Sequence, residues 1–293
     1  MKLWSEKLLM NKADGLFVAI AYNSDVVAYS KDCINWTTAT LPKYTNWSSV
    51  CYGNGVFVAV SQNTKVAAYS YDGVNWNETA LPTQAVWHSV CYGNGMFVAI
   101  ANNSKAAAYS YDGVTWKSTT LPYAAYWNSV NYGNGMFFVT TSTDTGCAYS
   151  TNGINWNALD VLKDGTYYDV VYAKGKFTTV EYVYGKIGAY STDGLNWVTT
   201  NAETVDRLYR FTYGEGKFVG VAASDGDAVY STDGINWNKA NDFSSQSWVD
   251  VAYGNGRFIT IGSSKFAYSN DGVNWVEIES PRSIEWVSIT FGG

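Results

Sequence analysis

The chain has 293 residues, a formal net charge of −6 at pH 7 and a pI of about 4.8. Because no basic stripe is present, binding to nucleic acid or to an anionic membrane surface through electrostatic attraction is disfavoured. No apolar run approaches the roughly 18 residues of a membrane span, so we expect no insertion into a membrane.

The first residues precede any repeated pattern. We expect residues 1–13 to form an N-terminal lead-in segment and residues 14–293 to form one domain. The lead-in lacks the apolar stretch and the small-residue cleavage site of a signal peptide, so we do not expect it to be one.

From residue 14 onward, one pattern of about 40 residues occurs seven times. The best copy, residues 87–122, reads WHSVCYGNGMFVAIANNSKAAAYSYDGVTWKSTTLP. The copies close on Trp36, Trp76, Trp116, Trp156, Trp197, Trp237 and Trp275. A fixed period of this length indicates one supersecondary unit repeated along the chain.

The first half of each copy predicts a hairpin. In the copy that starts at Trp47, Asn54-Gly55 separates two strand-like runs, which is the strongest sequence signal for a type I′ turn. This turn pairs Gly53 with Val56 and Tyr52 with Phe57.

The second half predicts another hairpin. Here Asp72-Gly73 is the expected two-residue turn, with Tyr69 facing Trp76. The turn residues expected across the copies are Asp72, Gly73, Asp112, Gly113, Asp193, Gly194, Asp233, Gly234, Asp271 and Gly272.

Four short strands in each of seven copies predict an all-β fold, a seven-bladed β-propeller with four-stranded blades. The chain ends on WVSITFGG, which matches the first strand of a copy, so we expect Trp286–Phe291 to pair with Leu16–Ile20 and close the ring. In the alternative, residues 8–12 fill this place and the C-terminal strand lies elsewhere.

The four cysteines are expected to be free thiols. Cys51 and Cys91 share a repeat position at which other copies have residues as different as Asn131 and Val171. A required disulfide or metal ligand would not tolerate that range, so we expect no metal and no cofactor.

The segments YSYDGVNW, YSYDGVTW, YSTDGLNW and YSTDGINW resemble the Asp-box of BNR-type propellers. That motif occurs in sialidases, sortilin-type receptors and photosystem assembly factors of the YCF48 kind. In this chain tryptophan follows serine by six residues rather than seven, Cys33 replaces the glycine of the first copy, and Asn152 replaces the aspartate of the fourth. The resemblance implies that the aspartates form structural turns remote from any active site. The full repeat looks most like those of phage tail and prophage-encoded proteins.

Departures from the repeat pattern gather in the loops between the second and third strands and in the connectors between copies, which we expect on one rim. The candidate ligand-binding residues there are Tyr44, Trp47, Lys65, Trp87, Asn102, Asn103, Lys105, Tyr123, Tyr126 and Trp127. A near-ring of aromatic residues belongs to this region: Trp47, Trp87, Trp127, Tyr167, Tyr209, Trp248 and Trp286. It predicts either packing between blades or a sugar-stacking platform. His88, the single histidine, is expected at a surface polar position.

Three functions compete. The first is a non-enzymatic, lectin-like propeller of a phage tail fibre or receptor-binding protein that recognises cell-surface glycan, located on a virion tail or outside the cell and oligomeric within a larger particle. The second is a protein-binding scaffold or assembly factor.

The third is a sialidase-like glycosidase, which needs an arginine cluster, an acid and a nucleophile. The only arginines are Arg207, Arg210, Arg257 and Arg282, so we expect the protein not to be an enzyme.

Overall fold

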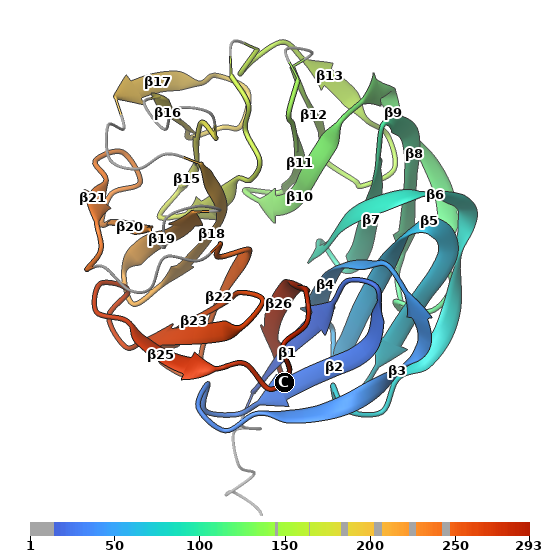
Figure 1. Cartoon of the computed structure of the whole chain (residues 1–293). Helices are drawn as coiled ribbons and strands as arrows, with labels where there is room; N and C mark the ends of the chain where they lie inside the picture. Colours follow the sequence, from blue (N-terminus) through green and yellow to red (C-terminus); the bar gives the residue numbers. More distant parts are fainter. Residues whose placement is uncertain are drawn as a thin grey trace, which may run out of the picture.

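The structure, a computed structural model, describes residues 15–143, 146–163, 165–182, 187–201, 207–222, 227–241 and 247–293. The predicted lead-in segment, residues 1–13, lies outside these ranges. Every regular element that they contain is a β-strand, and the sheets stand around a common axis as in a β-propeller (Figure 1). Within the same ranges, no helix is long and apolar enough to cross a membrane.

The strands form six sheets. The sheet at the chain ends contains β26 (Trp286–Gly292), β1 (Leu16–Ala21), β2 (Ser24–Ser30) and β3 (Thr37–Thr45). The next contains β4 (Trp47–Gly53), β5 (Val56–Ser70), β6 (Asn77–Gly93), β7 (Met96–Asn102), β8 (Ser104–Ser110) and β9 (Lys117–Ala125). A third contains β10 (Trp127–Gly133), β11 (Met136–Thr141), β12 (Cys147–Ser150) and β13 (Asn157–Leu159).

The remaining three sheets have the same order. One contains β14 (Val171–Ala173), β15 (Lys176–Val180), β16 (Ile187–Ser191) and β17 (Val198–Asn201). Another contains β18 (Leu208–Gly214), β19 (Lys217–Ala222), β20 (Ala228–Ser231) and β21 (Asn238–Lys239). The last contains β22 (Asp250–Gly254), β23 (Arg257–Ile261), β24 (Lys265–Ser269) and β25 (Val276–Glu279).

The prediction of seven separate four-stranded blades is therefore wrong. The described residues form five four-stranded sheets and one six-stranded sheet. The physical reason lies in the two longest strands, β5 and β6. Strand β6 pairs with β5 at Asn77–Ala80 and again at Ala85 and Val86, and with β7 through Val86–Gly93. The second and third repeats consequently share one hydrogen-bonded sheet, which a count of sequence repeats does not reveal.

The closure of the ring is confirmed. The C-terminal strand β26 pairs antiparallel with β1, and Leu16 faces Gly292 while Val18 faces Thr290. Figure 1 shows the first and last strands side by side in this sheet. Strands from both chain ends thus cover edges that would otherwise be unpaired.

The first hairpin of the copy that starts at Trp47 forms as predicted. Tyr52 pairs with Phe57 and Gly53 with Val56. Asn54 and Gly55 have φ angles of 49° and 79°, so both central residues of the turn are left-handed as a type I′ turn requires.

The second hairpin is wider than predicted. Tyr69 pairs with Asn77 rather than with Trp76, so the connection is not a two-residue turn. The carboxylate of Asp72 closes it instead, because Oδ1 accepts hydrogen bonds from the backbone N–H groups of Val74 (2.9 Å) and Asn75 (2.7 Å). These aspartates therefore satisfy backbone donors of their own turns.

The hydrophobic core lies between neighbouring sheets. Trp47, for example, is fully buried among residues of β1, β4 and β5. On the innermost strands, an aromatic ring of one repeat lies on a glycine of the repeat before it, as Tyr132 lies on Gly93. The same contact, Tyr52 on Gly292, joins the second repeat to the end of the chain.

Candidate functional site

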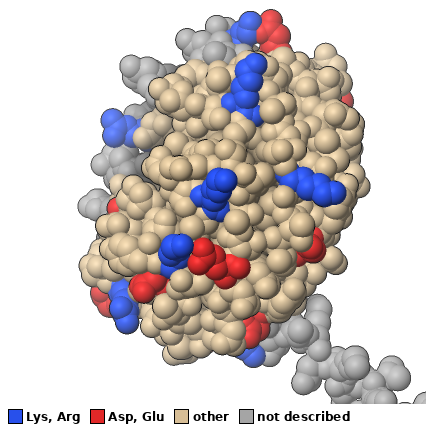
Figure 2. Space-filling view, turned by 90° about the vertical axis from the view of Figure 1, so that its right-hand side faces the viewer, with Lys and Arg blue, Asp and Glu red and all other residues tan. Residues whose placement is uncertain are grey.

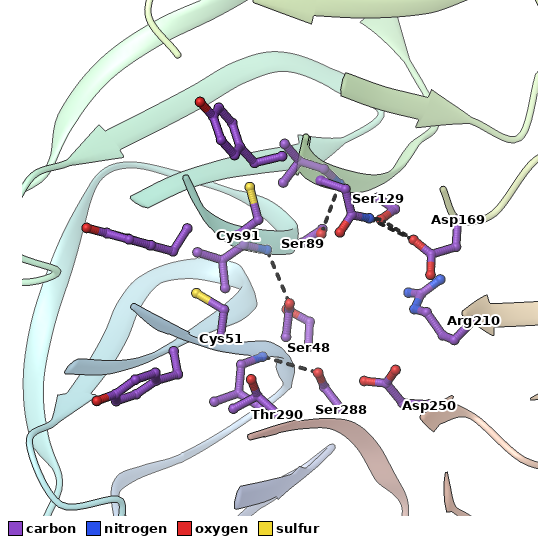
Figure 3. Close-up of a pocket in the computed structure, with 18 of the residues that line it drawn as sticks. Ser48, Cys51, Ser89, Cys91, Ser129, Asp169, Arg210, Asp250, Ser288 and Thr290 are labelled. Atoms are coloured by element: carbon purple, nitrogen blue, oxygen red, sulfur yellow. Dashed lines mark hydrogen bonds between the residues drawn. The ribbon is translucent and has the colours of Figure 1, made fainter. Parts of the chain in front are cut away.

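The innermost strands bring one residue from each repeat to the central axis. This axial ring consists of Ser49, Ser89, Ser129, Asp169, Arg210, Asp250 and Ser288. All seven line one cavity of about 290 Å³, the axial cavity (Figure 3). Each stands two residues after a buried residue, so the same position of every repeat supplies one member of the ring. These buried residues are Trp47, Trp87, Trp127, Tyr167, Leu208, Trp248 and Trp286.

Serines of the axial ring tie one innermost strand to the next. Ser49 Oγ accepts a hydrogen bond from Val90 N at 3.2 Å, and Ser89 Oγ accepts one from Val130 N at the same distance. Ser288 Oγ accepts one from Val50 N, which continues the pattern across the closure. The serine hydroxyl oxygens therefore give hydrogen-bond acceptors to backbone N–H groups that line the axial cavity.

Two carboxylates replace serine in the ring, and a guanidinium lies between them. Asp169 Oδ2 accepts a hydrogen bond from Phe211 N at 3.0 Å, and Asp250 Oδ2 accepts one from Ile289 N at 2.9 Å. Figure 3 shows Arg210 between the two carboxyl groups. Both aspartates thus keep the inter-repeat bond that serine makes elsewhere and add a buried negative charge.

Burial controls the electrostatics of this cluster. It raises the pKa of Asp250 to about 6, although the positive charge of Arg210 acts in the opposite direction. It also raises the pKa of Asp169, again opposed by Arg210. Arg210 itself loses solvation by burial, but Tyr209, Asp169 and Asp250 raise its pKa above the usual value, so it stays charged.

A second cavity, of about 370 Å³, opens on the rim that carries the loops between second and third strands. This rim cavity is lined by Tyr22, Trp47, Ser48, Gln62, His88, Tyr209, Arg210, Ser247, Val249, Glu285, Trp286 and Val287. Its walls combine an apolar side with hydrogen-bonding groups. This combination and this size are typical of small-ligand sites.

His88 supplies the least satisfied polar atom of the rim cavity. Its Nε2 is shielded from solvent and has no hydrogen-bond partner in the described part of the chain. Burial, together with the positive charge of Arg210, lowers its pKa to about 4, so the imidazole is neutral at pH 7. A neutral, shielded imidazole can donate or accept a hydrogen bond with a ligand.

Aromatic rings gather beside Arg210. The rings of Tyr168 and Tyr182 have centroids 4.3 Å apart, and those of Tyr168 and Tyr209 are 5.0 Å apart. The guanidinium of Arg210 lies 4.7 Å from the centroid of Tyr209. Arg210 is thereby held both by stacking and by hydrogen bonds from Nη1 to the carbonyl oxygens of Tyr168 and Tyr209.

The near-ring of aromatic residues has two interpretations, packing between blades or a sugar-stacking platform, and the structure distinguishes them. Trp47, Trp87 and Trp127 are fully buried, and Trp47 Nε1 donates to the carbonyl oxygen of Lys43. They pack between sheets and have no free face for a sugar. In the sixth repeat, the equivalent position belongs to Leu208, not Tyr209, because Leu208 pairs with Ala222 as Trp127 pairs with Thr141.

The other candidate residues lie scattered on the same rim. Tyr44 and Tyr126 are 64% and 50% exposed, Lys65, Asn103 and Lys105 are exposed, and Asn102 and Tyr123 are half-buried. Of the ten candidates, only Trp47 lines the rim cavity. On the face shown in Figure 2, charged side chains are likewise dispersed and form no large patch.

The charged residues of the axial ring are not among the candidate site residues predicted from the sequence. Asp169, Arg210 and Asp250 come from three repeats and meet only at the axis. The available signal was the repeat position itself, which reads Ser, Ser, Ser, Asp, Arg, Asp, Ser along the chain. His88 is expected at a surface polar position, but its Nε2 is shielded from solvent.

No protein-family model and no curated protein sequence matches the chain. Solved structures do match its fold. A streptogramin B lyase has a TM-score of 0.74 at 12% identity, covering 84% of this chain and 87% of that one. A catalytically inactive histidine-to-alanine variant of virginiamycin B lyase from Staphylococcus aureus, with quinupristin, has a TM-score of 0.72 at 10% identity, covering 93% and 97%.

YCF48 bound to D1 peptide matches with a TM-score of 0.66 at 14% identity, covering 84% of this chain and 86% of that one. At such low sequence identity, these structural matches establish the β-propeller fold alone. They also correct the expectation that the protein is not an enzyme, because enzymes are among the proteins that share this fold. That expectation rested on the residues of one reaction class, glycoside hydrolysis, and a fold does not determine the reaction.

Proposed function

We propose that the protein binds a short peptide or a peptide-like molecule in the rim cavity. The observation that carries this proposal is the unpartnered Nε2 of His88 in a cavity that also contains Tyr209 and Arg210. Peptides offer amide donors and acceptors together with apolar side chains, which suits a cavity lined by both apolar and hydrogen-bonding side chains. The match to YCF48 bound to D1 peptide supports a peptide ligand.

The test is affinity selection of a random hexapeptide pool on the purified full chain, with mass spectrometry of the retained peptides. We expect the wild type to enrich a defined set and His88→Ala to lose it while keeping its melting temperature. Tyr44→Ala is the matched control, because this exposed aromatic side chain stands on the same rim but outside the cavity. No enrichment by the wild type, or equal enrichment by His88→Ala, contradicts the proposal.

A second candidate function is acid–base catalysis at the same cavity. It is favoured by the neutral state of His88 at pH 7 and by its shielded nitrogen, which could exchange a proton with a bound ligand. Incubating the selected peptides with the protein tests it. A change in peptide mass or bonding that the wild type produces and His88→Ala does not supports catalysis, and unchanged peptides argue for binding alone.

A further inference from the structure

The rim cavity and the axial cavity are adjacent. Ser48, Arg210 and Val287 line both of them. A ligand held at His88 therefore lies beside Arg210, which belongs to the axial ring. Which end group of such a ligand fits the ring best depends on the charge of the ring.

The axial cavity contains two carboxyl groups and one guanidinium group. Its charged lining residues are Asp169, Arg210 and Asp250, so with all three ionised the net charge is 1 − 2 = −1. The other lining residues among the described part of the chain are uncharged: serines, cysteines, tyrosines and valines, together with Asn131, Phe211 and Thr290. A carboxylate end group would add a third negative charge to a buried site, which is strongly unfavourable.

The two carboxylates are not equally satisfied. Asp169 accepts hydrogen bonds from Ser129 Oγ (2.7 Å), Asn131 Nδ2 (2.9 Å) and Phe211 N. Asp250 accepts bonds from two backbone N–H groups, those of Val251 and Ile289. Asp250 is therefore the group with acceptor capacity left for a cation.

Resting on the proposed function, we propose that a primary ammonium group of the ligand enters the axial cavity and pairs with Asp250. A peptide N-terminus and a lysine side chain offer the same chemistry. The positive charge of the ammonium group compensates the second carboxylate. Its three N–H donors suit Asp250 together with the hydroxyl groups of Ser288 and Thr290, which line the same cavity. In this proposal Asp250, at a position where four of the seven repeats have serine, selects the ammonium end of the ligand.

The experiment compares two hexapeptide pools that contain no lysine and are amidated at the C-terminus, one with a free amino terminus and one acetylated. We expect the wild type to prefer the free-amine pool by about tenfold. Asp250→Asn should lose this preference, because the amide keeps an acceptor for Ile289 N but removes the charge.

Asp112→Asn is the matched control. It removes one negative charge from a turn in which Asn152 makes the equivalent bonds naturally in the next repeat. This variant should keep the preference. If Asp250→Asn fails to fold, competition on the wild type decides: methylammonium should release free-amine peptides more strongly than potassium at equal ionic strength.

The outcomes separate the two proposals. Equal binding of both pools by the wild type, with loss in His88→Ala, overturns the ammonium proposal and leaves the peptide site standing. A preference that survives in Asp250→Asn, or methylammonium acting no better than potassium, also overturns it. Binding of neither pool overturns the proposed function itself.

Discussion

Arg210 lies between two buried carboxyl groups, and its positive charge compensates theirs. If arginine is replaced by methionine, Asp169 and Asp250 face each other without a compensating charge. Removing one partner from a buried charge cluster costs about 3–5 kcal/mol. We therefore expect Arg210→Met to lower the free energy of unfolding by that amount in urea denaturation.

The matched control restores the ring pattern of the other repeats, with Asp169→Ser, Arg210→Ser and Asp250→Ser in one chain. Serine at this position accepts the inter-repeat N–H bond without a charge. This triple variant should be more stable than Arg210→Met. A stability of Arg210→Met within roughly 1 kcal/mol of the wild type would contradict the charge argument.

His88 gives the protein a specific pH dependence. Its pKa is about 4 in the folded state and 6.5 for the free side chain, so the unfolded chain binds more protons between these values. The stability contribution of neutral His88 is therefore complete above pH 6.5 and is lost as the pH falls toward 4.

Between pH 7 and pH 5, the wild type should lose about 2 kcal/mol more unfolding free energy than His88→Gln. Asp250 titrates in both proteins, so its contribution cancels in the comparison. Urea denaturation at the two pH values measures the difference. Parallel pH profiles of the two proteins would show that His88 is exposed and titrates normally.

At the scale of one hairpin, two turn glycines allow backbone strain to be separated from packing. Gly55 and Gly73 have φ angles of 79° and 73°, so alanine is strained equally at both. A methyl group at Gly55 would meet no atom within 4 Å, whereas at Gly73 it would lie 2.8 Å from Leu16 and 2.9 Å from Val18.

We expect Gly55→Ala to cost about 1–2 kcal/mol of unfolding free energy from left-handed strain alone. Gly73→Ala should cost a further 1–3 kcal/mol or so, because it overpacks the contact with β1. Thermal and urea unfolding of the two variants provide the measurement. Equal losses would mean that β1 yields to the extra methyl group without cost.

At the scale of the whole molecule, the ring depends on a strand from each end of the chain. Deleting Trp286–Gly293 removes β26, exposes the edge of β1, and removes Trp286 and Ile289 from the core cluster of this sheet. The melting temperature should fall sharply, and the truncated chain should associate through its new edge.

Calorimetry and light scattering of the truncated protein test this expectation. The internal control is a deletion of Gly293 alone, which leaves every pairing of β26 with β1 intact. A truncated protein that melts at the wild-type temperature would show that closure does not depend on β26.

The sequence by itself determined the local structure and the connectivity. The Asn-Gly pairs fix the first hairpin because few other residues adopt left-handed φ angles, and the match of WVSITFGG to a first strand predicts the closure. It did not determine the width of the second hairpin, where the side chain of Asp72 replaces a backbone turn. It also did not determine that two repeats share one sheet.

Only the tertiary structure decided the site. Each repeat places a single side chain at the axis, so Asp169, Arg210 and Asp250 become one charge cluster only when the strands close around it. Burial is likewise a property of the assembled ring: it hides Trp47 and its equivalents, and it leaves His88 neutral beside a cavity. Local periodicity can be read along a chain, but which departures from it face each other depends on contacts between residues about 40 or more positions apart.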